Sequence, residues 1–239
     1  MMEANASMLN NHQIDQRRPF EAAPDATPIV TPEVILPTLG RKGAETRGKL
    51  MTATAELLKT TALRDLRASA ISRYARVAVG TFYIYFENVE ALALALSWQV
   101  AEQAHYLAKL LRQPWYPGNA APIEDFIRAY FAFWDEHGPI LRVRNLADAG
   151  GDETFLEARL QMEVPLYRLL DAKVREAKDR GAVAAAENEI VVSGLLLGSL
   201  DHQASLSHFI DFDSYGMSRE SLISGAIFLF SKTLFAPTG

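Results

Sequence analysis

Few residues in this chain are of the types and at the spacings that catalysis requires. Ser199, Asp201 and His202 lie close together in the sequence, which suggests a nucleophilic triad. Neighbouring residues of a helix point about 100° apart, however, so Asp201 would not orient His202 for proton transfer. The sequence contains no G-x-G-x-x-G, P-loop, G-x-S-x-G or H-E-x-x-H motif. We therefore expect that the protein is not an enzyme.

The residue types that hold metal ions are equally scattered. Three acidic residues flank a glycine pair with a spacing that matches no EF-hand loop and is more typical of a helix-capping turn: Asp148, Asp152 and Glu153. Three histidines have no second histidine four residues away: His105, His137 and His208. The absence of cysteine excludes disulfides and thiolate zinc sites. We expect no metal and no cofactor.

The composition is that of a mildly acidic protein with a substantial core. Among the 239 residues, 24 are Lys or Arg and 29 are Asp or Glu, which gives a net charge of −5, and 49% are apolar. The longest uncharged apolar runs are about half of the roughly 20 residues that a membrane-spanning helix needs. The first residues show no secretory signal. We expect a cytoplasmic protein with no membrane partner.

Proline and charge divide the chain into three parts. Residues 1–40 hold five of the eleven prolines at four- or five-residue intervals, which predicts a flexible arm. Residues 41–90 carry nine basic and five acidic residues, whereas residues 91–239 carry thirteen basic and nineteen acidic residues. A small basic segment on an acidic protein indicates that only this segment meets a polyanion. The predicted domains are 1–40, 41–87 and 88–239.

Apolar residues recur at helical spacing from residue 44 onward, and no alternating β-branched run predicts a strand. The expected fold class is therefore all-α. Glycines and prolines predict the helix ends, including a break at Gly138–Pro139, and Pro165 predicts a kink or break in a longer helix. The expected helices span residues 44–60, 66–75, 79–85, 88–112, 123–137, 140–147, 153–180, 187–211 and 218–234.

The most informative stretch runs from Glu45 to Leu96. Its second and third helices are short and joined by a tight turn at Arg76 and Val77, and Asp65 is placed to cap the second helix. Two such helices predict a helix-turn-helix, whose second helix fits the major groove of DNA. The predicted architecture is an N-terminal three-helix helix-turn-helix domain followed by a helical ligand-binding and dimerisation domain.

This stretch resembles the TetR family of transcriptional regulators. The residues that carry the resemblance are Ile71, Ala75, Val77, the string Gly80-Thr81-Phe82-Tyr83-Ile84-Tyr85-Phe86, and Glu90-Ala91-Leu92. The rest of the chain is similar to the family only in the number and length of its helices. The resemblance implies a homodimeric regulator that binds a double-stranded DNA operator. It also implies a repressor that a small-molecule effector releases from that operator.

Resemblance and side-chain chemistry together assign the candidate DNA contacts. They are Arg41, Lys42, Arg47, Val79, Gly80, Thr81, Tyr83 and Tyr85. The two tyrosine hydroxyls would hold phosphates, Gly80 would let the backbone approach the DNA, and Val79 and Thr81 would reach base edges. Phe82 and Phe86 are expected in the core of the domain instead.

Three residues depart from the family's pattern. Arg76 stands where many relatives have the glycine of the turn, which predicts a left-handed backbone for an arginine. Val79 and Val89 stand where relatives often have lysine, so two phosphate-binding charges are missing, and the basic residues before the first helix are the expected compensation. An alternative function follows: a helical effector-binding or scaffolding dimer with weakened or lost DNA binding.

The last two expected helices are apolar on more than one face. Gly194, Gly198 and Gly225 permit close approach of helices, so we expect these helices to form the interface of a homodimer. The alternative is a thick monomeric core.

Aromatic and polar side chains of the body are candidates for an effector pocket, although an aromatic stripe is more often plain core. They are Trp98, His105, Tyr106, Tyr130, Trp134, Tyr167 and His202. Arg142 and Arg144 would suit an anionic ligand but are more typical of surface or capping charges. An effector is expected to change the tilt of the continuous helix 88–112 and so the separation of the two DNA-binding heads.

Overall fold

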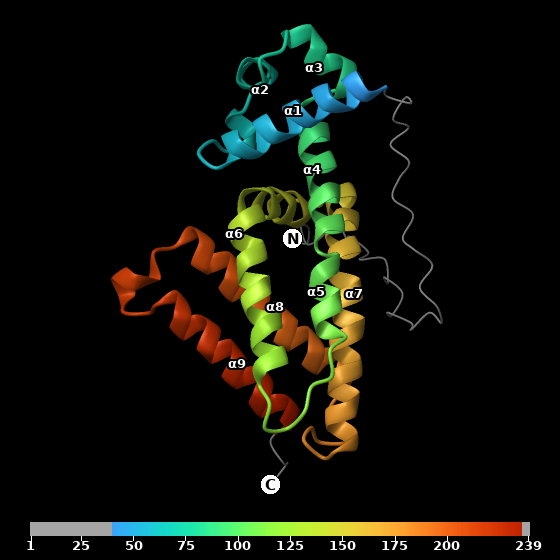
Figure 1. Ribbon diagram of the computed structural model, residues 1–239, viewed down its shortest axis with the longest axis vertical. Coiled ribbons are helices and arrows are strands. Elements are labelled where there is room, and N and C mark those ends of the chain that lie inside the picture. The colour runs from blue at the N-terminus through green and yellow to red at the C-terminus, as the bar shows by residue number, and fades with distance from the viewer. Residues whose placement is uncertain (1–39, 236–239) are drawn as a thin grey trace, which may run out of the picture. The chain divides into compact units, whose positions relative to one another are not determined.

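The computed structural model describes residues 40–235, apart from the side chains of residues 212 and 213, and these residues are all-α as predicted (Figure 1). The predicted arm falls outside this range except for Gly40. The α-helices are α1 (Arg41–Leu58), α2 (Ala68–Ala75), α3 (Val79–Tyr85), α4 (Val89–Gln103), α5 (His105–Leu111), α6 (Ala121–Ala149), α7 (Glu153–Asp179), α8 (Glu189–Phe209) and α9 (Arg219–Phe235). Short 3-10 helices lie at Leu63–Asp65 and Phe212–Tyr215. None of the helices between residues 40 and 235 has the length and apolarity needed to cross a membrane.

The first three helices, which we call the head, share one apolar core. Leu50 of α1, Ile71 of α2 and Phe82 of α3 are completely buried. Phe86 follows α3 directly and is buried with its ring centroid 5.9 Å from that of Phe82, as predicted for both phenylalanines. The seven residues of α3 are too few to form a stable helix alone, so tertiary packing holds this helix in place.

A left-handed arginine forms the turn between α2 and α3. Arg76 adopts φ 58° and ψ 45°, which confirms the prediction, and no other non-glycine residue between positions 40 and 235 has a positive φ. The N–H of Val77 donates to the Ser72 carbonyl at 2.9 Å, which closes the end of α2 as in a Schellman motif. The turn therefore has the geometry that usually calls for glycine.

The start of α2 differs from the prediction. Asp65 lies in the preceding 3-10 helix and does not cap α2, which begins at Ala68 after the extended residue Arg67. Leu66 is buried between the two elements. Because Leu66 must reach the core, the chain extends there, and the helix starts two residues later than a cap at Asp65 would place it.

The expected helix 88–112 is two helices. The first, α4, ends at Gln103, and α5 begins at His105. The Nδ1 atom of His105 lies within hydrogen-bonding reach of the Glu102 carbonyl, the group that would accept from Tyr106 in an unbroken helix. This local side-chain contact competes with the helical hydrogen bond. Apolar spacing, which continues through the break, could not reveal it.

The break expected at Gly138–Pro139 is also wrong, because α6 runs through both residues to Ala149. A side chain at Gly138 would overlap the ring of His208, so this glycine lets α8 pack directly against the backbone of α6. Burial of Trp134 and Leu141 on either side holds the helix together despite the missing proline donor. Pro165 likewise does not end α7, which is continuous from Glu153 to Asp179.

The helix α4 packs against both the head and the rest of the chain, which we call the body. It contacts α1, and it also contacts α6 and α7 (Figure 1). Its buried residues lie on more than one face and include Val89, Leu92, Trp98 and Val100. The helices α6, α7 and α8 pack on one another, and α9 packs mainly on α6. Head and body are therefore linked through α4.

Replacement of Arg76 by glycine is expected to stabilise the protein. The left-handed conformation costs an L-residue with a side chain about 1 kcal/mol, and glycine removes most of this cost. We expect the free energy of unfolding to rise by up to about 1 kcal/mol, measured by urea denaturation. The matched control is Arg73→Gly, inside α2 on an exposed face, which should lower it by about 1 kcal/mol. A loss of stability in both variants would contradict the strain at Arg76.

Candidate functional site

The exposed face of α3 carries residues predicted to contact DNA. Val79 and Tyr83 are 43% and 59% exposed, and a Cβ at Gly80 would meet no neighbouring atom of residues 40–235 within 4 Å. Thr81 and Tyr85 are half-buried, and Tyr85 packs against the core of the head. The helix thus offers an open face with methyl and hydroxyl groups and no charge, so its binding to phosphate relies on hydrogen bonds and on basic residues elsewhere.

Ile84, which was not among the predicted contacts, is the most exposed large apolar residue of α3, at 72%. It lies two residues from both Phe82 and Phe86, which point into the core, and so falls on the opposite side of the helix. An isoleucine held out toward solvent on this face is suited to touch a thymine methyl group or a sugar. The spacing of the two phenylalanines was the signal in the sequence that could have identified it.

The three basic residues of α1 that were predicted to contact DNA fall into two groups. Arg41 and Lys42 are exposed at the start of the helix, and Arg41 makes only a 3.6 Å ion pair with Glu45, which is worth little in solvent. Arg47 is half-buried instead, with its guanidinium 5.2 Å from the centroid of the Phe86 ring. Burial lowers the pKa of Arg47. Arg47 therefore packs on the core of the head, while the first two residues are the ones free to meet phosphates.

Two of the predicted effector contacts meet inside the body. Tyr130 and Trp134 lie one turn apart on α6, are completely buried, and donate to Oδ1 of Asp201 on α8 at 2.8 and 3.0 Å. Burial, followed by the negative charge of Asp201, raises the pKa of Tyr130 well above its usual value. The sequence suggested Asp201 only as a partner for His202, but His202 is exposed and Asp201 is bound by α6 instead.

Arg144 is completely buried, so its interpretation as a surface or capping charge is wrong. Because α6 continues past Gly138–Pro139, Arg144 falls three residues after the buried Leu141 and shares its inward face. One of its terminal nitrogens lies 3.8 Å from Oε1 of Glu163, and the other donates to the sulfur of Met162 at 3.3 Å. Arg142 stays exposed, with its guanidinium 4.7 Å from the centroid of the Phe209 ring.

A second arginine completes this buried ion network between α6 and α7. Arg159 pairs with Glu163 at 2.8 Å and with Asp148 at 2.9 Å. Burial raises the pKa of Glu163, and the charges of Arg159 and Arg144 act against this rise. The network lies near Tyr167, whose pKa is raised first by its own burial and next by Glu163. The sequence did not predict this network, because its members come from two helices. Which face of each helix points inward is defined only when the helices pack.

The remaining predicted effector contacts are spread out. Trp98 is buried in α4, and Tyr106 is partly exposed, with its hydroxyl donating to the Ala129 carbonyl at 3.3 Å. His105 is exposed, like His202. Asp152 accepts hydrogen bonds from the N–H groups at the start of α7, which confirms the helix-capping turn. Within residues 40–235 no group of three or more His, Asp or Glu side chains is arranged to hold a metal ion.

Comparison with known proteins decides the family. Residues 107–230, more than half of the chain, match the family described as the tetracyclin repressor-like C-terminal domain. The chain belongs to the TetR family. The helix-turn-helix sequence in the head agrees with this assignment, and this TetR-family protein is a DNA-binding transcriptional regulator.

Solved structures show the same fold at low sequence identity. The fatty acid degradation regulator FadR from Bacillus halodurans is 16% identical, with a TM-score of 0.59 over 77% of this chain and 94% of that one. The regulator FadR from Bacillus subtilis, in complex with stearoyl-CoA, is 15% identical, with a TM-score of 0.54 over 78% and 97%. The regulatory protein TetR from Rhodobacter sphaeroides is 22% identical, with a TM-score of 0.53 over 79% and 98%. No curated protein matches the sequence.

Removal of Arg159 is expected to destabilise this TetR-family protein more than removal of an exposed arginine. The variant Arg159→Met leaves the carboxylate of Glu163 buried with only the more distant Arg144, which should cost roughly 2–3 kcal/mol of unfolding free energy. The control Arg41→Met removes an exposed pair with Glu45, also four residues apart on one helix, and should cost less than about 1 kcal/mol. Urea denaturation measures the unfolding free energy of both variants. Equal losses would show that the buried network stabilises the protein no more than an exposed ion pair does.

Proposed function

We propose that this protein is a dimeric repressor whose two heads bind an operator and whose body binds a small effector that releases the DNA. The observation that carries the proposal is the exposed face of α3, with Val79, Tyr83 and Ile84, on a protein of the TetR family. A single short helix contacts too few base pairs to select a site, so two heads are needed.

The surface of α8 and α9 supports a dimer. Large apolar side chains are exposed on both helices: Ile190, Val191, Leu195, Phe228 and Leu229. A Cβ at Gly194, Gly198 or Gly225 would meet no atom of another described element within 4 Å, so these positions leave room for a partner helix. An apolar face of this kind on a protein in water marks an interaction surface. A second copy of α8 and α9 would bury it as a four-helix interface.

The effector would act through α4, which contacts both α1 of the head and α6 and α7 of the body. The sequence predicted one continuous helix over residues 88–112, but the helix breaks at Ala104. Effector binding in the body would therefore reach the head through the side chains packed around α4, and not through the tilt of one long helix. An effector that binds one arrangement 100-fold more tightly than the other supplies about 2.7 kcal/mol. Tyr130, Trp134 and Asp201 are the proposed polar anchors of the effector site.

The fold of this chain is also that of a Bacillus subtilis regulator in complex with stearoyl-CoA. A long-chain acyl-CoA is therefore a reasonable first compound to test as effector. Under the proposal an effector raises the dissociation constant for the operator, whereas a compound that binds the body without changing this constant is not the effector.

The function is tested by capture of sheared DNA from the source genome on purified protein at moderate salt, followed by sequencing. Competition with unrelated DNA separates specific from nonspecific recovery. A few enriched palindromic sites would support a dimeric regulator and identify its operators. Uniform weak recovery would contradict it and favour the alternative of a helical effector-binding or scaffolding dimer without DNA recognition.

Removal of the Tyr83 hydroxyl is expected to weaken DNA binding at every sequence. In Tyr83→Phe the exposed ring stays, but a hydrogen bond to a charged phosphate is lost, which corresponds to about a tenfold rise in the dissociation constant. The control is Tyr116→Phe, an equally exposed tyrosine between α5 and α6, which should leave binding unchanged. Fluorescence anisotropy with operator and random duplexes measures both variants. Unchanged binding in Tyr83→Phe would remove Tyr83 from the phosphate contacts.

A charge on the exposed face of α8 is expected to dissociate the dimer. Leu195 is 69% exposed in the single chain, and Leu195→Glu would bury a carboxylate in the interface. The control Leu146→Glu changes a residue of similar exposure, 65%, on α6. Analytical ultracentrifugation should show a monomer for Leu195→Glu and a dimer for the native protein and the control. A stable Leu195→Glu dimer would place the interface elsewhere.

A further inference from the structure

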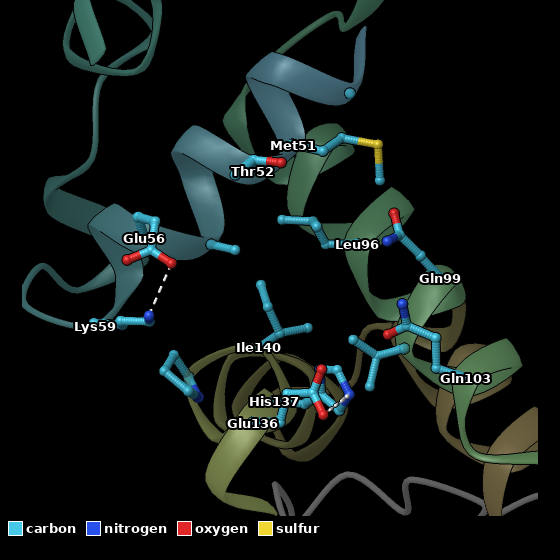
Figure 2. Close-up of a pocket in the computed structure, with 14 residues that line it drawn as sticks. Met51, Thr52, Glu56, Lys59, Leu96, Gln99, Gln103, Glu136, His137 and Ile140 are labelled. Atoms are coloured by element: carbon cyan, nitrogen blue, oxygen red, sulfur yellow. Dashed lines mark hydrogen bonds and ion pairs between the residues drawn. The ribbon is translucent and has the colours of Figure 1, made fainter. Parts of the chain in front are cut away.

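A cleft separate from the buried aromatic residues opens between the head and the body. Its walls are α1, α4 and α6, and its volume is about 380 Å³ (Figure 2). A space of this size accommodates a small organic molecule. Met51, Leu96 and Ile140 contribute buried apolar groups from the three helices, which gives the cleft a surface for an apolar ligand group.

The α4 wall of the cleft carries two amide side chains. Gln99 and Gln103 lie one turn apart on the same face of α4, and both are exposed (Figure 2). Neither amide has a hydrogen-bond partner among residues 40–235. Their carbonyl oxygens are therefore available as acceptors for a polar group placed in the cleft.

The charges around the cleft do not cancel. Glu56 and Lys59, on the α1 side, neutralise each other through an ion pair at 2.8 Å (Figure 2). Glu136, on the α6 side, is 75% exposed and faces only the ring of His137, at 3.8 Å. The ring of His137 packs on Phe133, and burial lowers the pKa of His137, so this histidine is neutral at neutral pH. Among residues 40–235 the carboxylate of Glu136 thus has no positive partner.

We propose that this cleft binds a small organic cation, a protonated amine that carries an apolar group. The ammonium group lies against the carboxylate of Glu136 and the amide oxygens of Gln99 and Gln103. The apolar group covers Met51, Leu96 and Ile140. Charge complementarity favours this occupant, because Glu136 attracts a cation, repels an anion of the same shape and gives a neutral molecule no such attraction.

A ligand in this cleft touches the head and the body at once. The wall residues Met51 and Thr52 belong to α1, whereas Glu136 and Ile140 belong to α6. Binding therefore stabilises the arrangement in which α1 lies beside α6, and by linkage it changes the affinity for any second ligand that prefers another arrangement. The site itself does not depend on the proposed repressor function, because it needs neither DNA nor the buried Tyr130–Trp134–Asp201 cluster.

The test uses three probes of similar shape and different charge: 2-phenylethylamine as the cation, 2-phenylethanol as the neutral control and 3-phenylpropionate as the anion. The full-length protein is labelled with ¹³C at the methionine methyl groups and titrated with each probe by NMR at neutral pH. Met51 reports on the cleft, while Met162 contacts Arg144 in the body and reports on the buried network. We expect the amine alone to shift the Met51 signal, with Met162 unchanged.

Two variants and one control connect this binding to the cleft. Glu136→Gln should weaken amine binding by about fivefold, the effect of one exposed charge pair. Gly48→Leu places a side chain at the cleft, where a Cβ meets no atom within 4 Å, and should block binding without disturbing the fold. Glu157→Gln removes an exposed carboxylate of α7, outside the cleft, and should leave binding unchanged.

The possible outcomes separate this proposal from the proposed repressor function. Equal binding of amine and alcohol, a shift at Met162 alone, no shift at Met51 up to millimolar amine, or unchanged affinity in Glu136→Gln would each overturn the cation site. None of these results bears on operator binding. Conversely, a protein that fails to enrich genomic DNA can still bind the amine at Met51, so the two proposals fail independently.

Discussion

The packing of α3 against the head is the constraint on which the rest of the structure depends. A helix of seven residues does not form alone, so the core contacts of Phe82 and Phe86 with the helices before it both fold α3 and orient its outer face. The left-handed turn at Arg76 sets the angle at which α3 leaves α2. These inward contacts position every residue on the exposed face of α3. A change that weakens the core of the head would therefore also displace the side chains on that face.

The helix α4 extends this dependence into the body. It is buried on more than one face because it packs on α1 as well as on α6 and α7. A rearrangement around α4 therefore changes contacts of the head and of the body together, which is the physical requirement for coupling between distant sites. Because the helix breaks at Ala104, only α4 connects the head rigidly to the body. The helix α5 can then stay packed in the body when α4 tilts.

Two groups of buried polar side chains in the body satisfy one another. Asp201 accepts from a tyrosine and a tryptophan of α6, and Glu163 is held by two arginines. Buried charges of this kind add little net stability over apolar residues, but they are costly to separate, so they fix the register of α6, α7 and α8 relative to one another. The cleft beside α1 differs, because the carboxylate of Glu136 and the amides of Gln99 and Gln103 are exposed. Within residues 40–235 this carboxylate has no cationic partner and the two amides have no hydrogen-bond partner. In this structure the buried groups are paired with one another, whereas the polar groups of the cleft face solvent.

The sequence by itself determined the helical class, the limits of most helices, the inward role of Phe82 and Phe86, and the left-handed turn at Arg76. These features are local, because apolar spacing, turn geometry and a short motif lie within a few residues of one another. Only the tertiary structure decided that α6 continues through Gly138–Pro139, because the cost of a proline is offset by burial and by the close approach of His208. The same continuity placed Arg144 inside the body, where the carboxylate of Glu163 on α7 compensates its charge. The partners of Asp201 and the lining of the cleft likewise depend on helices far apart in the chain, whose inward faces are defined only when they pack.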